Sequence, residues 1–153
     1  GGRPIDGGRT WGGSRLLGDG KTWRGTAAGT LAGFALALVL NAVNATAESL
    51  LGFGPPRFSL LAAVGLAFGA MCGDIAASFL KRRTGRERGA PFPGLDQLDF
   101  VVGALCVAAV LDFGWVSGVF SFPVLAVVLL VTPLLHVLTN AIAYAIGVKD
   151  EPW

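Results

Sequence analysis

The sequence predicts an all-α membrane protein, a bundle of four transmembrane helices. Two observations support this prediction: the composition is strongly apolar, and the apolar residues gather in four long runs. The chain is 53% hydrophobic and only 14% charged, whereas a soluble domain carries roughly a quarter charged residues. A third observation, the uneven distribution of Lys and Arg, predicts the orientation in the membrane.

The four apolar runs each have the length of a membrane-crossing helix. A helix rises about 1.5 Å per residue, so about 20 residues span the hydrocarbon core. A soluble bundle with buried helices is excluded, because too few polar residues remain to cover four such runs. Signal peptides are excluded too, since four runs cannot all be cleavable leaders. The runs cover residues 26–46, 59–80, 100–119 and 122–148.

Basic residues indicate which side of the membrane each loop faces. Two crossings separate the two main basic clusters, so both clusters lie on one side, which the positive-inside rule makes the cytoplasm. We therefore expect one integral-membrane domain over residues 1–153. Its cytoplasmic loops are 1–25 and 81–98, and its helix pairs are 26–80 and 99–148. The clusters contain ten of the twelve Lys and Arg residues: Arg3, Arg9, Arg15, Lys21, Arg24, Lys81, Arg82, Arg83, Arg86 and Arg88.

Three acids lie at the edges of the apolar runs. Asp74 follows about fifteen apolar residues, a costly position for a carboxylate unless it faces a polar cavity or a cation. Ser78 and Lys81 follow at helical spacing and share a face with Asp74, and Asp96 and Asp99 share a face in the same way. Because all three acids return to one membrane surface, their hard oxygens predict a Mg²⁺ site.

The basic residues beside these acids suit phosphate groups. Arg binds phosphate as a bidentate fork and Lys as a point charge, so Lys81, Arg82 and Arg83 are candidate phosphate contacts. A positive-inside cluster that contacts anionic lipid headgroups is the alternative. That alternative does not account for the three acids, and the combination favours phosphate chemistry on an amphiphilic substrate.

The N-terminal 25 residues are a second candidate region, rich in Gly and interspersed with basic residues. The sequence GDGKT at 18–22 invites a P-loop interpretation. The P-loop motif, however, needs a Gly where Arg15 stands, and no buried strand precedes it. A flexible Gly-rich loop can still wrap phosphates through its backbone N–H groups. Candidate nucleotide contacts in this region are Asp19, Lys21, Thr22 and Arg24.

Two stretches resemble one enzyme family. S-x-x-K-R at 78–82, followed by P-G-L-D-Q-L-D at 93–99, partly matches the signature of the membrane CTP-dependent phosphatidate cytidylyltransferases. The His-Gly-Gly of that signature is absent, and Gln97 replaces the Arg of its D-R-x-D. These departures, with G-D-G-K-T-W-R-G at 18–25 and P-F-P-G-L-D-Q-L-D-F at 91–100, resemble the archaeal branch, the CDP-archaeol synthases.

The resemblance implies a reaction at the cytoplasmic face of the cell membrane. CTP and 2,3-bis-O-geranylgeranyl-sn-glycerol 1-phosphate, an isoprenoid ether lipid phosphate, would give CDP-archaeol and pyrophosphate. Mg²⁺ is the expected cofactor, no nucleic-acid partner is expected, and a further helix is expected ahead of Gly1. The candidate catalytic residues are Asp74, Asp96, Asp99 and Lys81, the three acids also being the Mg²⁺ ligands. The candidate CTP and phosphate contacts are Asp19, Lys21, Thr22, Arg24, Ser78, Arg82 and Arg83.

Other functions stay open on sequence grounds. A phosphatidate cytidylyltransferase that acts on ester lipids would differ only in its acceptor. An anion transporter would distribute polar residues along several helices near the bilayer midplane, and a lipid-binding scaffold would need the basic cluster without the acids. The concentration of both charges at one surface favours an enzyme.

The remaining polar and small residues have predicted structural roles. Asp112 interrupts the third apolar run, which predicts that the helix ends there. His136 and Asn140 share one face of the last helix and are expected to hydrogen-bond across helices. Cys72 and Cys106 lack CxxC spacing and are expected to be packing residues. Two GxxxGxxxG ladders predict close helix packing: Gly25, Gly29 and Gly33, then Gly65, Gly69 and Gly73.

Overall fold

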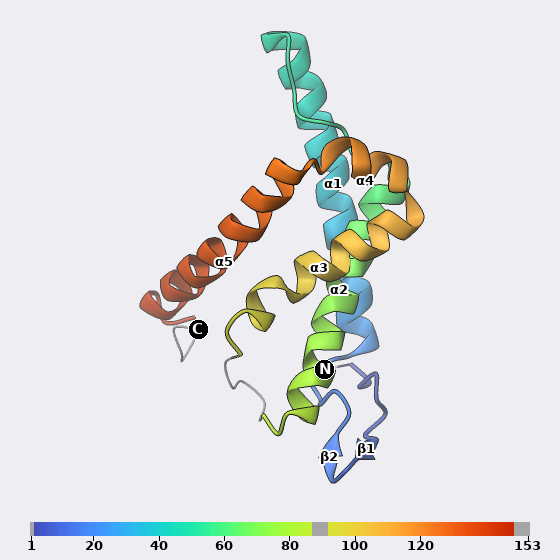
Figure 1. Cartoon of the computed structure of the whole chain (residues 1–153), viewed down its shortest axis with the longest axis vertical. Coiled ribbons are helices and arrows are strands. Elements are labelled where there is room, and N and C mark those ends of the chain that lie inside the picture. Colours follow the sequence, from blue (N-terminus) through green and yellow to red (C-terminus); the bar gives the residue numbers. More distant parts are fainter. Residues whose placement is uncertain (1, 87–91, 149–153) are drawn as a thin grey trace.

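The computed structural model describes residues 2–86 and 92–148, and these residues are mostly helical. Figure 1 shows two long helices side by side, a third helix crossing the second, and the last helix standing apart. A small hairpin lies at the end of the molecule where the first helix begins and the second ends. The elements are β1 (Thr10–Trp11), β2 (Ser14–Arg15), α1 (Trp23–Leu51), α2 (Leu60–Arg83), α3 (Leu95–Leu111), α4 (Phe113–Val119) and α5 (Phe122–Ala145).

Three helices in the described ranges are long and apolar enough to cross a membrane: α1, α2 and α5. They correspond to the first, second and fourth predicted runs, which confirms the membrane class. The third apolar run, 100–119, contains a break at Asp112. That run is divided between α3, which begins earlier and has 17 residues, and the seven-residue α4.

Asp112 divides the third run, as predicted, because its side chain begins a new helix. The Asp112 carboxylate accepts a hydrogen bond from Trp115 N at 3.0 Å and so caps α4. Its other oxygen accepts from Ser59 Oγ at 2.5 Å. Ser59 is itself the N-cap of α2 and accepts from Ala62 N at 3.0 Å. One carboxylate thus joins the start of α2 to the junction of α3 and α4.

The second glycine ladder brings α2 and α3 into backbone contact, which confirms the close packing predicted for it. A Cβ atom added at Gly65 would lie 2.7 Å from Ala108 Cα, and one at Gly69 would lie 2.8 Å from Ala104 Cα. Gly73 lies against the backbone of Asp99. Asp74 follows Gly73 directly, so this contact sets two of the three predicted acids beside each other.

The N-terminal Gly-rich segment is folded around one buried carboxylate, whereas the sequence led us to expect a flexible loop. Asp6 accepts hydrogen bonds from the backbone N–H groups of Gly8, Leu17 and Gly18. It also pairs with Arg15 at 2.8 Å, and its side chain is fully buried. The hairpin turn between β1 and β2 uses Gly12 and Gly13 at φ 60° and 79°, a conformation that favours glycine.

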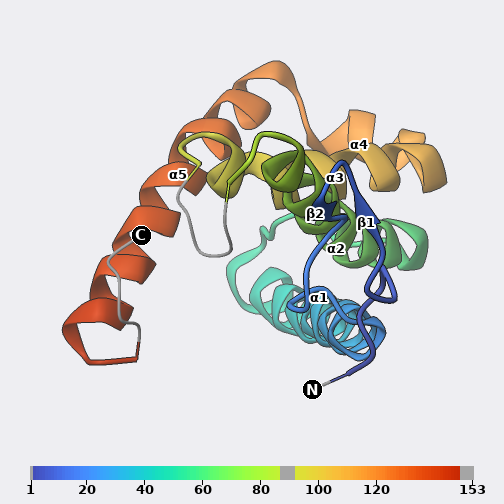
Figure 2. The same cartoon turned by 90° about the horizontal axis from the view of Figure 1, so that it is seen from below.

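The hairpin lies against the C-terminal end of α2. Seen from below, Figure 2 places β1 and β2 at that end, while α5 stands to one side of the other helices. The first residues of the loop also pair with the segment just before α1, through Ile5 N to Lys21 O at 2.8 Å. The start of α1, the end of α2 and the loop are therefore held together at one end of the helices.

Candidate active site

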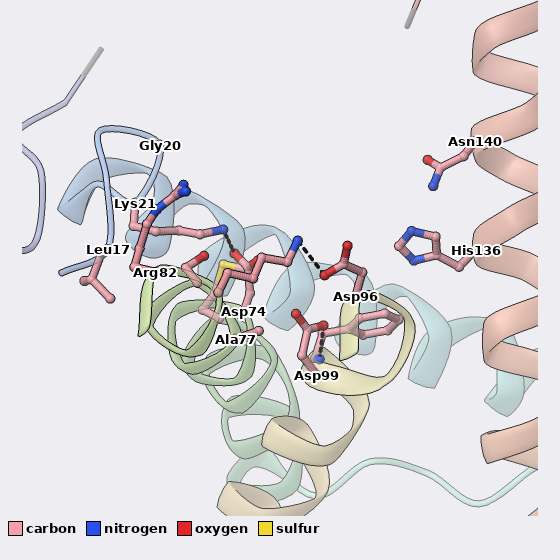
Figure 3. Close-up of a pocket in the computed structure, with 14 residues that line it drawn as sticks. Leu17, Gly20, Lys21, Asp74, Ala77, Arg82, Asp96, Asp99, His136 and Asn140 are labelled. Carbon is pink, nitrogen blue, oxygen red and sulfur yellow. Dashed lines mark hydrogen bonds and ion pairs between the residues drawn. The ribbon is translucent and has the colours of Figure 1, made fainter. Parts of the chain in front are cut away.

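A cavity of about 630 Å³ lies where the N-terminal loop, the C-terminal half of α2, the start of α3 and one face of α5 approach one another. We call it the polar cavity; Figure 3 shows its side chains. The predicted candidates that line it are Lys21, Asp74, Ser78, Lys81, Arg82, Asp96 and Asp99. The other lining residues are Leu17, Gly20, Met71, Ala77, Phe100, His136 and Asn140.

Two lysine–aspartate ion pairs cross the polar cavity. Lys21 Nζ lies 2.5 Å from Asp74 Oδ2, which joins the N-terminal loop to α2. Lys81 Nζ lies 2.5 Å from Asp96 Oδ1, which joins α2 to α3. The side chains in both pairs are between 20% and 42% exposed. The ammonium groups are therefore accessible from the cavity and can exchange one anionic partner for another.

Asp96 and Asp99 both point into the polar cavity from the first turns of α3 (Figure 3). The second oxygen of Asp96 accepts from Phe92 N at 3.0 Å. Asp99 Oδ1 accepts from Phe100 N at 2.6 Å. This arrangement bears out the prediction that Asp96 and Asp99 share one helical face, and Asp74, Ser78 and Lys81 likewise reach one cavity from α2.

The donor atoms of the polar cavity suit a hard cation, since three carboxylates line it. In the part of the chain that the structure describes, no three acidic, His or Cys groups converge closely enough to hold a metal ion. Two of the three acids are paired with lysine ammonium groups instead. A metal ion at these acids would therefore compete with the ammonium groups of Lys21 and Lys81 for carboxylate oxygens.

Four predicted contacts lie outside the polar cavity. Asp19 is exposed and pairs with Arg15 at 2.8 Å. Thr22 is the N-cap of α1 and accepts from Gly25 N at 3.0 Å. Arg24 is exposed and does not line the cavity. Arg83 is turned to the hairpin, and Arg88 of the predicted basic cluster is outside the described residues.

Arg83 donates hydrogen bonds to the hairpin, outside the polar cavity. Its guanidinium donates to Trp11 O at 2.5 Å, to Arg15 O at 2.9 Å and to Ser14 O at 3.2 Å. It also lies 5.5 Å from the ring centres of both Trp11 and Phe79. The neighbouring Arg82 lines the polar cavity. The contacts of Arg83 instead position the N-terminal loop beside that cavity.

Asp6 and Arg15 are structural residues that sequence reasoning missed. The hydrogen bonds from Arg15 and from three backbone N–H groups hold the pKa of the Asp6 carboxyl well below its usual range. Asp6 in turn raises the pKa of Arg15. A signal was present in the sequence, because an acid followed by two glycines in a Gly-rich segment is typical of a loop folded on a side chain.

His136 and Asn140 lie on the wall of the polar cavity, opposite Asp96 (Figure 3). The sequence placed them correctly on one face of the last helix but predicted only a contact between helices. Their position makes them candidate ligand contacts. The signal was a pair of polar side chains on one face of an otherwise apolar membrane helix.

Comparisons with known proteins agree with the sequence resemblance. Residues 1–153 match a family model described as CarS-like, CDP-archaeol synthase. A CDP-archaeol synthase of Halorubrum lacusprofundi is 67% identical, covering 100% of this chain and 85% of that protein. One of Halobacterium salinarum is 65% identical, covering 100% and 84%. A solved structure, described as an intramembrane enzyme for archaeal membrane lipids biosynthesis, matches with TM-score 0.71 at 40% identity, covering 92% of this chain and 80% of that one.

Proposed function

The chain belongs to the CDP-archaeol synthase family, and on that premise we propose that the polar cavity is where a cytidylyl group passes from CTP to an archaeal lipid phosphate. Family membership makes the chain a CTP-dependent cytidylyltransferase of membrane lipid biosynthesis. The proposed acceptor is 2,3-bis-O-geranylgeranyl-sn-glycerol 1-phosphate, and the products are CDP-archaeol and pyrophosphate. The supporting observation is that the N-terminal loop, α2 and α3 bring three acids and three basic side chains to one cavity.

The proposed reaction is an in-line displacement at phosphorus. A phosphate oxygen of the lipid attacks the α-phosphorus of CTP, a new P–O bond forms, and the bond to pyrophosphate breaks. No general base is needed, because a phosphate monoester is largely ionised at neutral pH. The work of the protein is therefore to position two anions and to neutralise the charge that repels them.

Lys21, Lys81 and Arg82 are the proposed phosphate contacts, and Ser78 adds a hydroxyl donor on the same wall. In the structure, two of these cations are paired with acids of the cavity. A triphosphate entering the cavity would compete for the ammonium groups of Lys21 and Lys81, because phosphate oxygens are strong acceptors for both. The released carboxylates of Asp74 and Asp96 would then face the phosphates together with Asp99.

We propose that these three carboxylates hold Mg²⁺ when the nucleotide is bound. When bound, Mg²⁺ would neutralise charge on the phosphate oxygens and orient them, as it does in other phosphoryl-transfer sites. The support in this chain is the chemistry of the donors and their shared cavity. Because Asp74 and Asp96 are engaged by lysines, metal and nucleotide are expected to bind cooperatively rather than metal alone.

We further propose that the polar cavity opens to the cytoplasm and that α3 with α4 completes a fourth crossing. Helix α3 has 17 residues, which at about 1.5 Å per residue is somewhat shorter than the hydrocarbon core. The basic residues at the end of α2 support the cytoplasmic side.

Cysteine labelling tests this topology. In a background without Cys72 and Cys106, a thiol at Thr10 or Thr84 should react only from the cytoplasm, and one at Ser49 only from outside. Reaction of Thr10→Cys and Thr84→Cys from opposite sides would refute this topology.

The proposed function is tested with purified protein, Mg²⁺, CTP labelled in its α-phosphate, and a panel of lipid phosphates. We expect label in the geranylgeranyl ether lipid and release of pyrophosphate, with little turnover of ATP or GTP. If the protein prefers ester phosphatidate as the acceptor, the proposed acceptor is wrong, but the proposed reaction, cytidylyl transfer to a lipid phosphate, stands. Transfer to none of the lipids by folded protein would end the proposal.

A further inference from the structure

A separate cavity of about 460 Å³ lies between the N-terminal loop and the last turns of α2. We call it the loop pocket, and its volume is within the range of about 300–1,000 Å³ that is typical of small-molecule sites. Leu17 lines both the loop pocket and the polar cavity, so the loop forms part of the wall of each. The residues used below are Ile5, Asp6, Arg9, Leu16 and Leu17 of the loop and Phe79 of α2.

The loop pocket lies at the boundary of the hydrocarbon. Phe79 is one of the last two residues of the second apolar run, and the basic end of α2 follows it within one turn. The ring centres of Phe79 and Trp11 are 6.3 Å apart, and Trp11 is 63% exposed. Because Trp gathers at the level of lipid headgroups, this contact places the pocket where lipid chains meet headgroups, on the side that the proposed topology makes cytoplasmic.

Arg9 brings one positive charge to the loop pocket. Its backbone is fixed on both sides, since Arg9 N donates to Asp6 O at 3.0 Å and Leu16 N donates to Arg9 O at 3.0 Å. Arg9 is exposed, and among residues 2–86 and 92–148 no carboxylate forms an ion pair with it. A guanidinium in this setting can donate both prongs of its fork to a phosphate group.

The rest of the lining is apolar or already neutralised. Asp6 accepts from Arg15 and from three backbone N–H groups, so its charge is compensated inside the loop. The apolar walls are Ile5, Leu16, Leu17 and Phe79. One cation beside apolar walls at a membrane boundary fits an anionic amphiphile.

We propose that the loop pocket binds an anionic phospholipid of the surrounding bilayer, with its phosphate at Arg9 and the upper part of its chains against Phe79. This lipid differs from the acceptor of the reaction, because it carries a phosphodiester and lies outside the polar cavity. A soluble phosphate is a poorer occupant, since it would leave the apolar walls in contact with water.

Occupancy links the loop to α2. A lipid that contacts Arg9 and Leu16 on one side and Phe79 on the other joins the two elements. The same loop carries Gly20 and Lys21 into the polar cavity. We therefore expect the bound lipid to steady the loop and to lower KM for CTP. This effect on KM rests on the proposed function, whereas binding of the lipid does not.

Trp11 reports occupancy, because it lies beside Phe79 but does not line the loop pocket. The complete protein is placed in phosphatidylcholine nanodiscs that contain a rising share of brominated phosphatidylglycerol or of brominated phosphatidylcholine. Trp11 fluorescence is taken as the difference between each protein and its Trp11→Phe counterpart. We expect the anionic lipid to quench Trp11 at about one fifth of the share that the zwitterionic lipid needs, the preference that one basic residue near the surface gives.

Substitutions at Arg9 assign the preference to the loop pocket. Arg9→Gln should abolish it, and Arg9→Lys should keep it because the charge remains. The matched control is Arg57→Gln, at an exposed arginine that pairs with Glu48 and does not line the pocket; it should keep the full preference.

Three results would overturn the proposal. Equal quenching by the two lipids in wild type shows no preference for an anion, and quenching by neither shows that another part of the protein covers the pocket. A preference that survives in Arg9→Gln belongs to the basic end of α2 as a whole. Glycerol 1-phosphate, which has no lipid chains, should not reverse the quenching, and reversal by it would assign the pocket to a soluble phosphate instead.

Cytidylyl transfer in the same nanodiscs tests the effect on the loop. With phosphatidylglycerol present, KM for CTP should be about fivefold lower in wild type than in Arg9→Gln, with similar kcat. The two proteins are compared within one bilayer composition, because a charged surface also changes the local concentrations of CTP and Mg²⁺. An equal KM overturns the proposed effect on the loop. Absence of transfer in wild type would refute the proposed function and leave the quenching result readable.

Discussion

Two regions of the molecule hold aspartates in opposite ways. In the N-terminal loop, the buried Asp6 accepts from three backbone N–H groups and from Arg15, partners that the fold fixes in place. In the polar cavity, Asp74 and Asp96 face lysine ammonium groups on long, partly exposed side chains. A carboxylate with fixed partners organises structure, whereas one that faces exchangeable cations is available to a ligand.

The difference predicts that neutralising a cavity acid destroys activity and spares the fold. Asp74→Asn, Asp96→Asn or Asp99→Asn keeps the side-chain shape and removes a charge near the reacting phosphates. We expect kcat to fall about 100-fold or more, the loss seen when one electrostatic stabiliser is removed. Folding should persist, since a carboxylate at the membrane boundary is costly and its neutralisation relieves that cost. Cytidylyl transfer and thermal unfolding in detergent measure the two effects.

Magnesium titration and a remote acid complete this test. Higher Mg²⁺ should partly restore the cavity variants, because mass action compensates weakened metal affinity. Glu48→Gln is the matched control: Glu48 is an exposed acid paired with Arg57 far from the polar cavity, and its loss should leave activity near wild type. Full activity of Asp96→Asn or Asp99→Asn contradicts the metal-site proposal.

Asp6→Asn should show the reverse pattern, with loss of loop structure before loss of chemistry. The amide places donors where Asp6 now accepts from Leu17 and Gly18, and it leaves Arg15 without its buried counter-charge. Losing these contacts should loosen the loop, so the loop should become sensitive to limited proteolysis while the long helices stay resistant. KM for CTP should rise because Lys21 and Gly20 reach the cavity from this loop. A protease-resistant loop in Asp6→Asn would show that Asp6 is not its organiser.

Helical periodicity explains how much of the candidate site the sequence predicted. Asp74, Ser78 and Lys81 reach one cavity because their spacing fixes a common face, and the same holds for Asp96 and Asp99. Periodicity predicts that Arg82 and Arg83 point in different directions, since successive helix positions differ by about 100°, but it could not predict what Arg83 binds. The partners of Arg83 are backbone carbonyls of a hairpin. Such carbonyl positions depend on the folded loop rather than on any side-chain pattern.

The sequence likewise predicted the long helices of the fold but not the contacts that join its shorter segments. Apolar run lengths predicted α1, α2 and α5, because the membrane imposes a minimum length on each crossing. Run length alone could not show that Asp112 caps a new helix, which depends on Ser59 at the start of α2. The Gly-rich loop was missed for the same reason: its order comes from contacts between Asp6 and residues about ten positions away.

Arg83→Lys should have a smaller effect than loss of Asp6. A lysine keeps the positive charge, but its ammonium is a compact point charge that lacks the planar fork by which Arg83 reaches three carbonyls and lies beside the rings of Trp11 and Phe79. Losing about 1–1.5 kcal/mol of hydrogen bonding should reduce kcat/KM for CTP about tenfold, mainly through KM. Arg57→Lys at the exposed Glu48 pair is the control and should be near neutral. A fall in kcat with unchanged KM would instead place Arg83 at the reacting groups.

The smallest expected effect is the response of the loop to acid. Hydrogen bonds from Arg15 and the backbone lower the pKa of Asp6 in the folded loop, below the unfolded value of about 3.9. Its stabilising contribution is therefore fully present above about pH 4 and is lost as the pH falls through the lower, folded pKa. The ring centres of Trp11 in the loop and Phe79 in α2 are 6.3 Å apart. The fluorescence of Trp11, measured as the difference between wild type and Trp11→Phe, therefore reports whether the loop is docked on α2. We expect that difference to be constant from pH 8 to about pH 4 and to change only below it. In the Asp6→Asn background the acid transition should disappear, and a wild-type midpoint well above pH 4 would show that another group controls the loop.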